Sequence, residues 1–157
     1  PGTNLCFETE HGPSGFDGPG GGDEVNILEK GKNYGWPIIS NGMDYSTNRP
    51  YPETIGPSAP GMESPHHMWP KSPGLSGMAF YVGHPQSPWN NSLFLGALAD
   101  RNLIRLSLDG DRIIAEERLL GDLGARIRDV RVGSDGNVYV LTEDDGRLLK
   151  LEPPAGR

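Results

Sequence analysis

The chain has 157 residues, enough for one domain with a buried core. Its formal net charge of −7 argues against a nucleic-acid partner or an anionic membrane surface, because both bind basic proteins. The chain contains no run of about twenty apolar residues, so the sequence predicts no membrane-spanning helix. Its single cysteine, Cys6, excludes an internal disulfide framework. A divalent cation or a small neutral or cationic ligand suits this charge better.

The 23 glycines and 15 prolines fall between short runs of alternating apolar residues and follow no period. This pattern predicts many tight turns between many short strands, so we expect an all-β fold and not disorder.

Near the N-terminus, we expect a long functional loop over residues 8–37. Calcium binds six to eight hard oxygen atoms from carboxylates and carbonyls, which a loop rich in acids and glycines supplies. The spacing is not that of an EF-hand, and a solvated acidic surface loop is the open alternative. The acidic residues of this segment are Glu8, Glu10, Asp17, Asp23 and Glu24.

An internal repeat is the most informative feature of the chain. Residues 92–106 align without a gap on residues 137–151, an offset of 45 residues, which is typical of four-stranded propeller blades. A weaker copy pairs residues 5–7 with residues 24–27. The repeat therefore predicts about three blades, too few to close a ring, with a β-sandwich as the alternative.

Two Asp-Gly pairs predict hairpin turns within the repeated region. Asp109-Gly110 and Asp135-Gly136 each separate two alternating runs, and glycine accepts the positive φ that a tight hairpin turn requires.

A basic pair stands at the start of a predicted strand. Arg126 and Arg128 are two residues apart, so their side chains point to the same face, with Asp129 next in the chain. Two guanidinium groups on one face suit a compact polyanionic ligand, because each binds carboxylates bidentately. Surface arginines paired with nearby acids are the open alternative.

Aromatic and histidine residues carry weaker signals. Most aromatics are expected to pack in the core, and one or two could stack on a flat ring or a sugar. The four histidines show no zinc-binding spacing. These residues are Tyr34, Trp36, Tyr45, Trp69, Phe80, Tyr81 and Trp89, and His11, His66, His67 and His84.

Five motifs in order extend over nearly the whole chain: EHGP followed by GGDEVNILEKGKNYGWP, then SGMAFY, LFLGAL, RIRDVR and GNVYVLTEDDGRLLKLEP. Together they resemble the soluble PQQ-dependent aldose sugar dehydrogenases of the glucose/sorbosone dehydrogenase family. The resemblance implies a six-bladed β-propeller, of which residues 1–157 form about three C-terminal blades. It also implies oxidation of the C1 hydroxyl of aldoses to a lactone, with PQQ and calcium as cofactors and an external electron acceptor.

The resemblance further implies the roles of individual residues. Calcium ligands are implied at the Glu24 side chain and the carbonyls of Tyr34, Gly12 and Pro13. The arginines would meet the carboxylates of PQQ. Implied PQQ contacts are Tyr45, Ala97, Leu98, Ala99, Arg126, Ile127 and Arg128.

The chain departs from the family pattern in two ways. Extra residues between Pro13 and Asp23 leave the geometry of the calcium turn open. The family's catalytic histidine and an Arg-Asn cofactor pair belong to earlier blades, and His11 is the histidine of the EHGP motif, not the base. We therefore expect the 157 residues to be inactive alone. The resemblance implies a periplasmic or secreted protein.

Two other functions remain open at this stage. A non-catalytic propeller binding module would need neither the arginine pair nor the acidic loop. A lactonase-like calcium propeller would hydrolyse its substrate without a redox cofactor, and the arginine pair argues mildly against it. The sequence does not identify the sugar or the electron acceptor.

Overall fold

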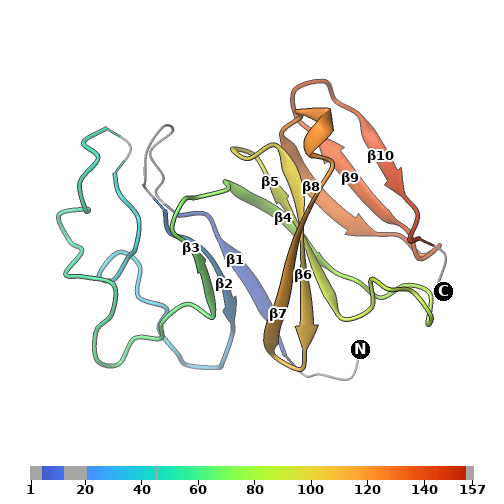
Figure 1. Cartoon of the computed structure of the whole chain (residues 1–157). Coiled ribbons are helices and arrows are strands. Elements are labelled where there is room, and N and C mark those ends of the chain that lie inside the picture. The colour runs from blue at the N-terminus through green and yellow to red at the C-terminus, as the bar shows by residue number, and fades with distance from the viewer. Residues whose placement is uncertain (1–4, 13–20, 45, 155–157) are drawn as a thin grey trace. The chain divides into compact units, whose positions relative to one another are not determined.

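A computed structural model of the chain describes residues 5–12, 21–44 and 46–154 (Figure 1). It confirms the all-β prediction, because the described elements are strands in three antiparallel sheets and one short 3-10 helix. The elements are β1 (Phe7–Glu10), β2 (Asp23–Ile27), β3 (His67–Trp69), β4 (Leu75–Phe80), β5 (Ser92–Ala97), β6 (Asn102–Asp109), β7 (Arg112–Leu119), η1 (Gly121–Leu123), β8 (Ile127–Val132), β9 (Val138–Thr142) and β10 (Leu148–Leu151).

The chain divides into two compact units, a first over residues 4–75 and a second that begins at Ser76 and continues to the C-terminal end. Each unit is described by itself below. That the sheets are three blades of a six-bladed propeller stays a prediction. Among the residues that the structure describes, no helix is long and apolar enough to cross a membrane.

The first unit holds the sheet β1-β2-β3, with β2 in the middle. β1 and β2 pair antiparallel from Phe7 opposite Ile27 to Glu10 opposite Glu24. The pairing of the weak first copy is thus present, but its first strand begins at Phe7 and not at residue 5. The expected loop over residues 8–37 is wrong at these positions, since Glu8, Glu10 and the acids of β2 lie on paired strands. The acidic residues Glu8 and Glu10 stand at strand positions where apolar residues were expected, so the sequence of β1 did not show the apolar alternation typical of a strand.

The second unit holds two sheets, ordered β4-β5-β6-β7 and β10-β9-β8. Both predicted Asp-Gly turns are present: Gly110 joins β6 to β7 with φ 66°, and Gly136 lies between β8 and β9 with φ 75°. The register of the two repeated hairpins is also the same. Leu93 pairs with Leu106 in one hairpin, and their repeat equivalents Val138 and Leu151 pair in the other.

One core lies between the two sheets of the second unit. The Tyr81 hydroxyl donates to the carbonyl of Gly136, at 2.9 Å, and so satisfies the polar end of a buried ring. Tyr81, Trp89 and Phe94 pack edge to face. The predicted core role of Tyr81 and Trp89 is thereby confirmed. The buried cluster consists of Tyr81, Trp89, Phe94, Leu103, Ile127, Val130, Val138 and Val140.

Gly96 lets β5 approach β8 closely. A Cβ atom at this position would lie against the Ser76 hydroxyl, 2.9 Å from Cγ2 of Ile127 and 3.0 Å from its carbonyl oxygen. The Ser76 hydroxyl donates to that same carbonyl at 2.7 Å. The contact therefore fixes the end of β5 against the start of β8.

We expect Gly96→Ala to destabilise the protein by about 1–3 kcal/mol, because the added methyl group would force this close contact apart. Gly121→Ala is the matched control, since a Cβ there would meet no atom within 4 Å, and its effect should stay within about 0.5 kcal/mol. Urea unfolding measures both free energies. Equal stability of the two variants would contradict the close packing of β5 on β8.

Candidate functional site

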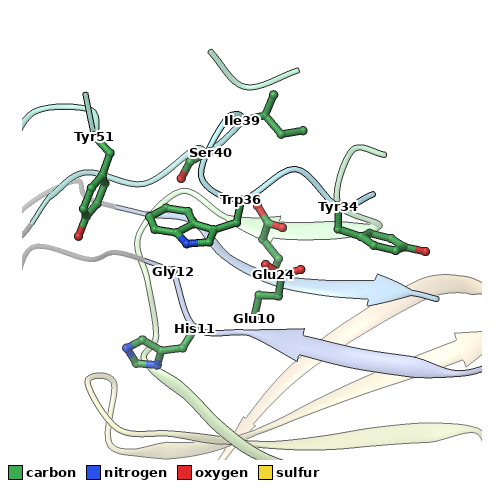
Figure 2. Close-up of a pocket in the computed structure, with 10 residues that line it drawn as sticks. Glu10, His11, Gly12, Glu24, Tyr34, Trp36, Ile39, Ser40 and Tyr51 are labelled. Carbon is green, nitrogen blue, oxygen red and sulfur yellow. The ribbon is translucent and has the colours of Figure 1, made fainter. Parts of the chain in front are cut away.

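A pocket of about 470 Å³ lies in the first unit, above the paired strands β1 and β2 (Figure 2). Its lining combines two carboxylates, a histidine, two glycines and an aromatic wall. The lining residues are Glu10, His11, Gly12, Gly22, Glu24, Tyr34, Trp36, Ile39, Ser40 and Tyr51.

Glu10 and Glu24 face each other directly across β1 and β2, so their carboxylates stand on the same side of the sheet. Burial raises the pKa of Glu10 to about 7, helped by a hydrogen bond with Glu8 and by the charges of Glu24 and Glu8. Burial also raises the pKa of Glu24, although hydrogen bonds from Asn26 and Asn41 oppose this shift. Burial thus disfavours the ionised form of both carboxyl groups, and a nearby positive charge would favour it.

Asn26 lies beside these carboxylates with one polar atom unpaired. Its Nδ2 donates to Oε1 of Glu10 at 3.0 Å, whereas its buried Oδ1 has no hydrogen-bond partner. A buried carbonyl oxygen without a partner costs free energy unless a donor or a cation reaches it. The strand position of Asn26, two residues after Glu24, places it on the same face.

Asp23 fixes the turn that follows β1. Its carboxylate is fully buried and accepts the backbone N–H of Gly12 at 2.8 Å and that of Leu75 at 2.6 Å. His11 Nδ1 lies 2.8 Å from the carbonyl oxygen of Leu75. The EHG turn is thus tied to Leu75 through two side chains, which determines where the backbone of Gly12 lies at the edge of the pocket.

Aromatic residues form one wall of the pocket. Trp36 and Tyr51 pack edge to face with ring centroids 5.0 Å apart, and Trp36 keeps 51% of its surface exposed. Trp36 is therefore one of the aromatics outside the core, as expected for one or two of the set. The Tyr34 hydroxyl donates to the carbonyl of Ile27 at 2.7 Å and accepts the backbone N–H of Glu29 at 2.8 Å, so the residue is held at the end of β2.

Three of the four residues predicted to bind calcium, Gly12, Glu24 and Tyr34, line this one pocket. Pro13 lies outside the described residues. Within the described ranges, no three carboxylate, histidine or cysteine side chains are grouped closely enough to hold a metal ion. Calcium also uses backbone carbonyls, and the unpaired Oδ1 of Asn26 suits a hard cation, so the donor set fits calcium.

In the second unit, Arg126 and Arg128 reach the same acceptor. Nε of Arg126 and Nη2 of Arg128 each lie 2.9 Å from Oε2 of Glu143, so the two side chains share a face, as predicted. Their pairing with a nearby acid is also what the surface-arginine alternative expects. Hydrogen bonds from both arginines lower the pKa of Glu143. The strand β8 begins only at Ile127, and its pairing shifts register between Ile127 and Asp129.

The predicted segment of Ala97, Leu98 and Ala99 lies at the end of β5, next to this arginine pair. Ala97 and Leu98 are buried and Ala99 is exposed. Arg101, in the same turn, donates to the carbonyl of Gly124 at 2.7 Å and to Asp144 at 2.6 Å. The structure thus brings together two segments with predicted cofactor contacts. Tyr45 lies outside the described residues.

We expect Asp23→Ala to lower the free energy of unfolding by about 2–5 kcal/mol, because two buried N–H groups would lose their acceptor. Asp23→Asn keeps one carbonyl acceptor and should cost less. Asp122→Ala, at an exposed position, is the control and should change stability by at most about 0.5 kcal/mol. Thermal unfolding measures all three, and an effect of Asp23→Ala no larger than the control would contradict this role.

Comparison with known proteins places the chain in a family. Residues 1–150 match the family model described as Glucose / Sorbosone dehydrogenase. The chain is 47% identical over 154 residues to the aldose sugar dehydrogenase YliI of Escherichia coli (strain K12), and the match covers 98% of this chain and 40% of that protein. The chain therefore spans less than half the length of this relative.

Solved structures of sugar dehydrogenases are also similar to this chain. A crystal structure of glucose dehydrogenase is 55% identical with a TM-score of 0.86, covering 97% of this chain and 42% of that one. The PQQ-bound form of aldose sugar dehydrogenase from Streptomyces coelicolor is 22% identical with a TM-score of 0.66, covering 94% and 40%, which is a likeness of fold. Given the family match over residues 1–150, the chain belongs to the glucose/sorbosone dehydrogenase family.

Proposed function

We propose that this chain supplies part of the cofactor site of a PQQ- and calcium-dependent dehydrogenase that oxidises the C1 hydroxyl of aldose sugars to lactones. The observation that carries the proposal is the convergence of Arg126 and Arg128 on one carboxylate oxygen. The similarity to an aldose sugar dehydrogenase and to glucose dehydrogenase supports the substrate class.

The arginine pair suits the carboxylates of PQQ. A guanidinium group presents its N–H donors in a planar fork that matches a carboxylate, and it stays charged at every physiological pH. Arg126 and Arg128 already contact one carboxylate, that of Glu143, each through a single nitrogen on the same oxygen. They would bind and orient the cofactor, while the turn of Ala97, Leu98 and Ala99 lies beside them.

Calcium would be held in the pocket of the first unit. Glu24, Gly12 and Tyr34 line this pocket and would offer a carboxylate and two backbone carbonyls. The buried Oδ1 of Asn26, whose amide donates to Glu10, has no hydrogen-bond partner and is a further candidate. When bound, PQQ supplies the redox chemistry and calcium supplies Lewis acidity. The described residues contribute by binding these groups: the carboxylates compensate the cation, and Asp23 holds the turn that carries Gly12.

Several finer expectations stay predictions. These are the six-bladed ring with three blades from this chain, the periplasmic or secreted location, the external electron acceptor and the inactivity of the 157 residues alone. A non-catalytic binding module and a lactonase-like calcium propeller remain the alternatives. Neither alternative gives a role to a pair of arginines that converge on a carboxylate.

We expect Arg126→Ala and Arg128→Ala each to weaken PQQ binding by roughly 10–100-fold, since each removes a charge-assisted hydrogen bond of about 1.5–3 kcal/mol. The assay is dye-linked oxidation of glucose and other aldoses by the full-length protein, with PQQ and calcium added. Arg112→Ala is the matched control, because Arg112 pairs with Asp109 on the exposed surface. Wild-type protein that oxidises no aldose and binds no PQQ would refute the proposal, and lactone hydrolysis would favour the lactonase-like alternative.

We expect Glu24→Gln to raise the calcium concentration needed for half-maximal activity by about 10-fold or more, because a neutral amide compensates a divalent cation less well. Glu63→Gln is the control in the same unit, since Glu63 forms an exposed pair with Lys32. Calcium titration of the chelator-treated protein measures both variants. An unchanged calcium requirement in Glu24→Gln would remove Glu24 from the calcium site.

A further inference from the structure

We propose that Glu143 is a positioning residue that holds Arg126 and Arg128 in the orientation in which they receive an anionic ligand. The inference rests on the proposed function, because the ligand in question is the carboxylate-bearing cofactor. It assigns a role to an acidic residue in the turn between β9 and β10. Glu143 lies within the motif GNVYVLTEDDGRLLKLEP, but the motif assigns it no role of its own.

The first step is the shared acceptor. One oxygen of Glu143, Oε2, takes an N–H from each guanidinium at 2.9 Å. The two donor nitrogens therefore cannot lie farther apart than twice that distance. Two positive charges so close repel each other, and a carboxylate between them offsets this repulsion. Both arginines lower the pKa of Glu143, so this carboxylate is ionised at neutral pH.

The second step is the rigidity of Glu143 itself. Its backbone N–H donates to the carbonyl of Arg126 at 2.9 Å, so backbone and side chain both bind the same residue. The turn that carries it is closed by Thr142, whose N–H donates to the carbonyl of Arg147 at 2.9 Å and whose Oγ1 accepts the N–H of Arg147 at 2.9 Å. Because the turn already restrains Glu143, little side-chain entropy of Glu143 is lost when its carboxylate pairs with the two arginines.

The third step is the set of donors that remain. Glu143 uses Nε of Arg126 and Nη2 of Arg128. Elsewhere among the described residues, the other guanidinium nitrogens of these two arginines have no hydrogen-bond acceptor. An incoming carboxylate therefore meets free N–H groups and does not have to displace Glu143. This geometry favours positioning over competition for the same donors.

The same conclusion follows from exposure. The side chains of Arg126, Arg128 and Glu143 keep 26%, 48% and 37% of their surface. At such exposure an ion pair contributes little to global stability. Removing Glu143 should therefore change ligand binding more than folding. Partners that orient a binding group in this way typically change affinity by about 10–100-fold when they are lost.

The test compares Glu143→Ala and Glu143→Gln with wild type in the full-length protein. PQQ affinity is measured by titrating the cofactor-free protein and following the PQQ absorbance. We expect about 10-fold weaker binding in Glu143→Ala and a smaller loss in Glu143→Gln, because the amide oxygen still accepts hydrogen bonds. Glu117→Ala is the matched control, since Glu117 pairs with Arg105 alone at an exposed site of the same unit; it should bind PQQ as wild type does.

A pH profile separates positioning from a purely structural role. The folded-state pKa of Glu143 is depressed below its ordinary value of 4.5, so its charge is present above that pH and is lost as pH falls through the depressed pKa. The affinity difference between wild type and Glu143→Gln should thus persist at neutral pH and shrink in acid. Unfolding midpoints of Glu143→Ala and Glu117→Ala should match.

Three outcomes would overturn the inference. Unchanged PQQ affinity in Glu143→Ala, with the expected loss in Arg126→Ala and Arg128→Ala, would refute the role of Glu143 and leave the proposed function intact. Tighter binding in Glu143→Ala would show that Glu143 competes with the ligand. Wild-type protein that binds no PQQ would overturn the proposed function, and this inference with it.

Discussion

The arrangement of the first unit depends on one fully buried carboxylate, that of Asp23. It accepts backbone N–H groups from Gly12 and Leu75, which are far apart in the chain. A buried carboxylate is costly unless such donors satisfy it, so the positions of the three segments depend on one another. The hydrogen bonds of Asp23 also position the pocket. The turn after β1 cannot move without breaking them, so Gly12 stays beside Glu10 and Glu24.

β2 is a central strand that buries acids where a purely structural strand would bury aliphatic side chains. Asp23, Glu24 and Asn26 are all buried, yet only Asp23 has its hydrogen-bonding groups matched by backbone donors. Burial is the main reason why the pKa values of Glu10 and Glu24 are raised, and the charges of neighbouring acids add to it. A bound cation would favour the ionised form of both carboxylates, so these buried acids suit a cation site better than a purely structural strand.

The sequence predicted the second unit better than the first, for a physical reason. In the second unit the apolar alternation and the Asp-Gly turns determine the hairpins, so a gapless repeat carries the pairing register itself, as Leu93 with Leu106 and Val138 with Leu151 show. In the first unit, acids at strand positions concealed β1 and part of β2. Asn26 was missed, although its two-residue spacing from Glu24 was a usable signal. Glu143 was missed because its contact with Arg126 joins segments that only the folded turn brings together.

The two candidate sites differ in how their charged side chains are compensated before a ligand binds. The pocket of the first unit holds buried carboxyl groups whose ionised form is disfavoured by burial, whereas the arginine pair of the second unit is already neutralised in part by Glu143. That difference follows from what each site would hold. A hard cation is attracted by uncompensated carboxylates, but two guanidinium groups need an internal anion to stay close together before a ligand arrives. The close packing of Gly96 on Ile127 then gives the arginine pair a fixed base. The buried core thus fixes the backbone at this site, and the ion pairs with Glu143 orient the two arginine side chains.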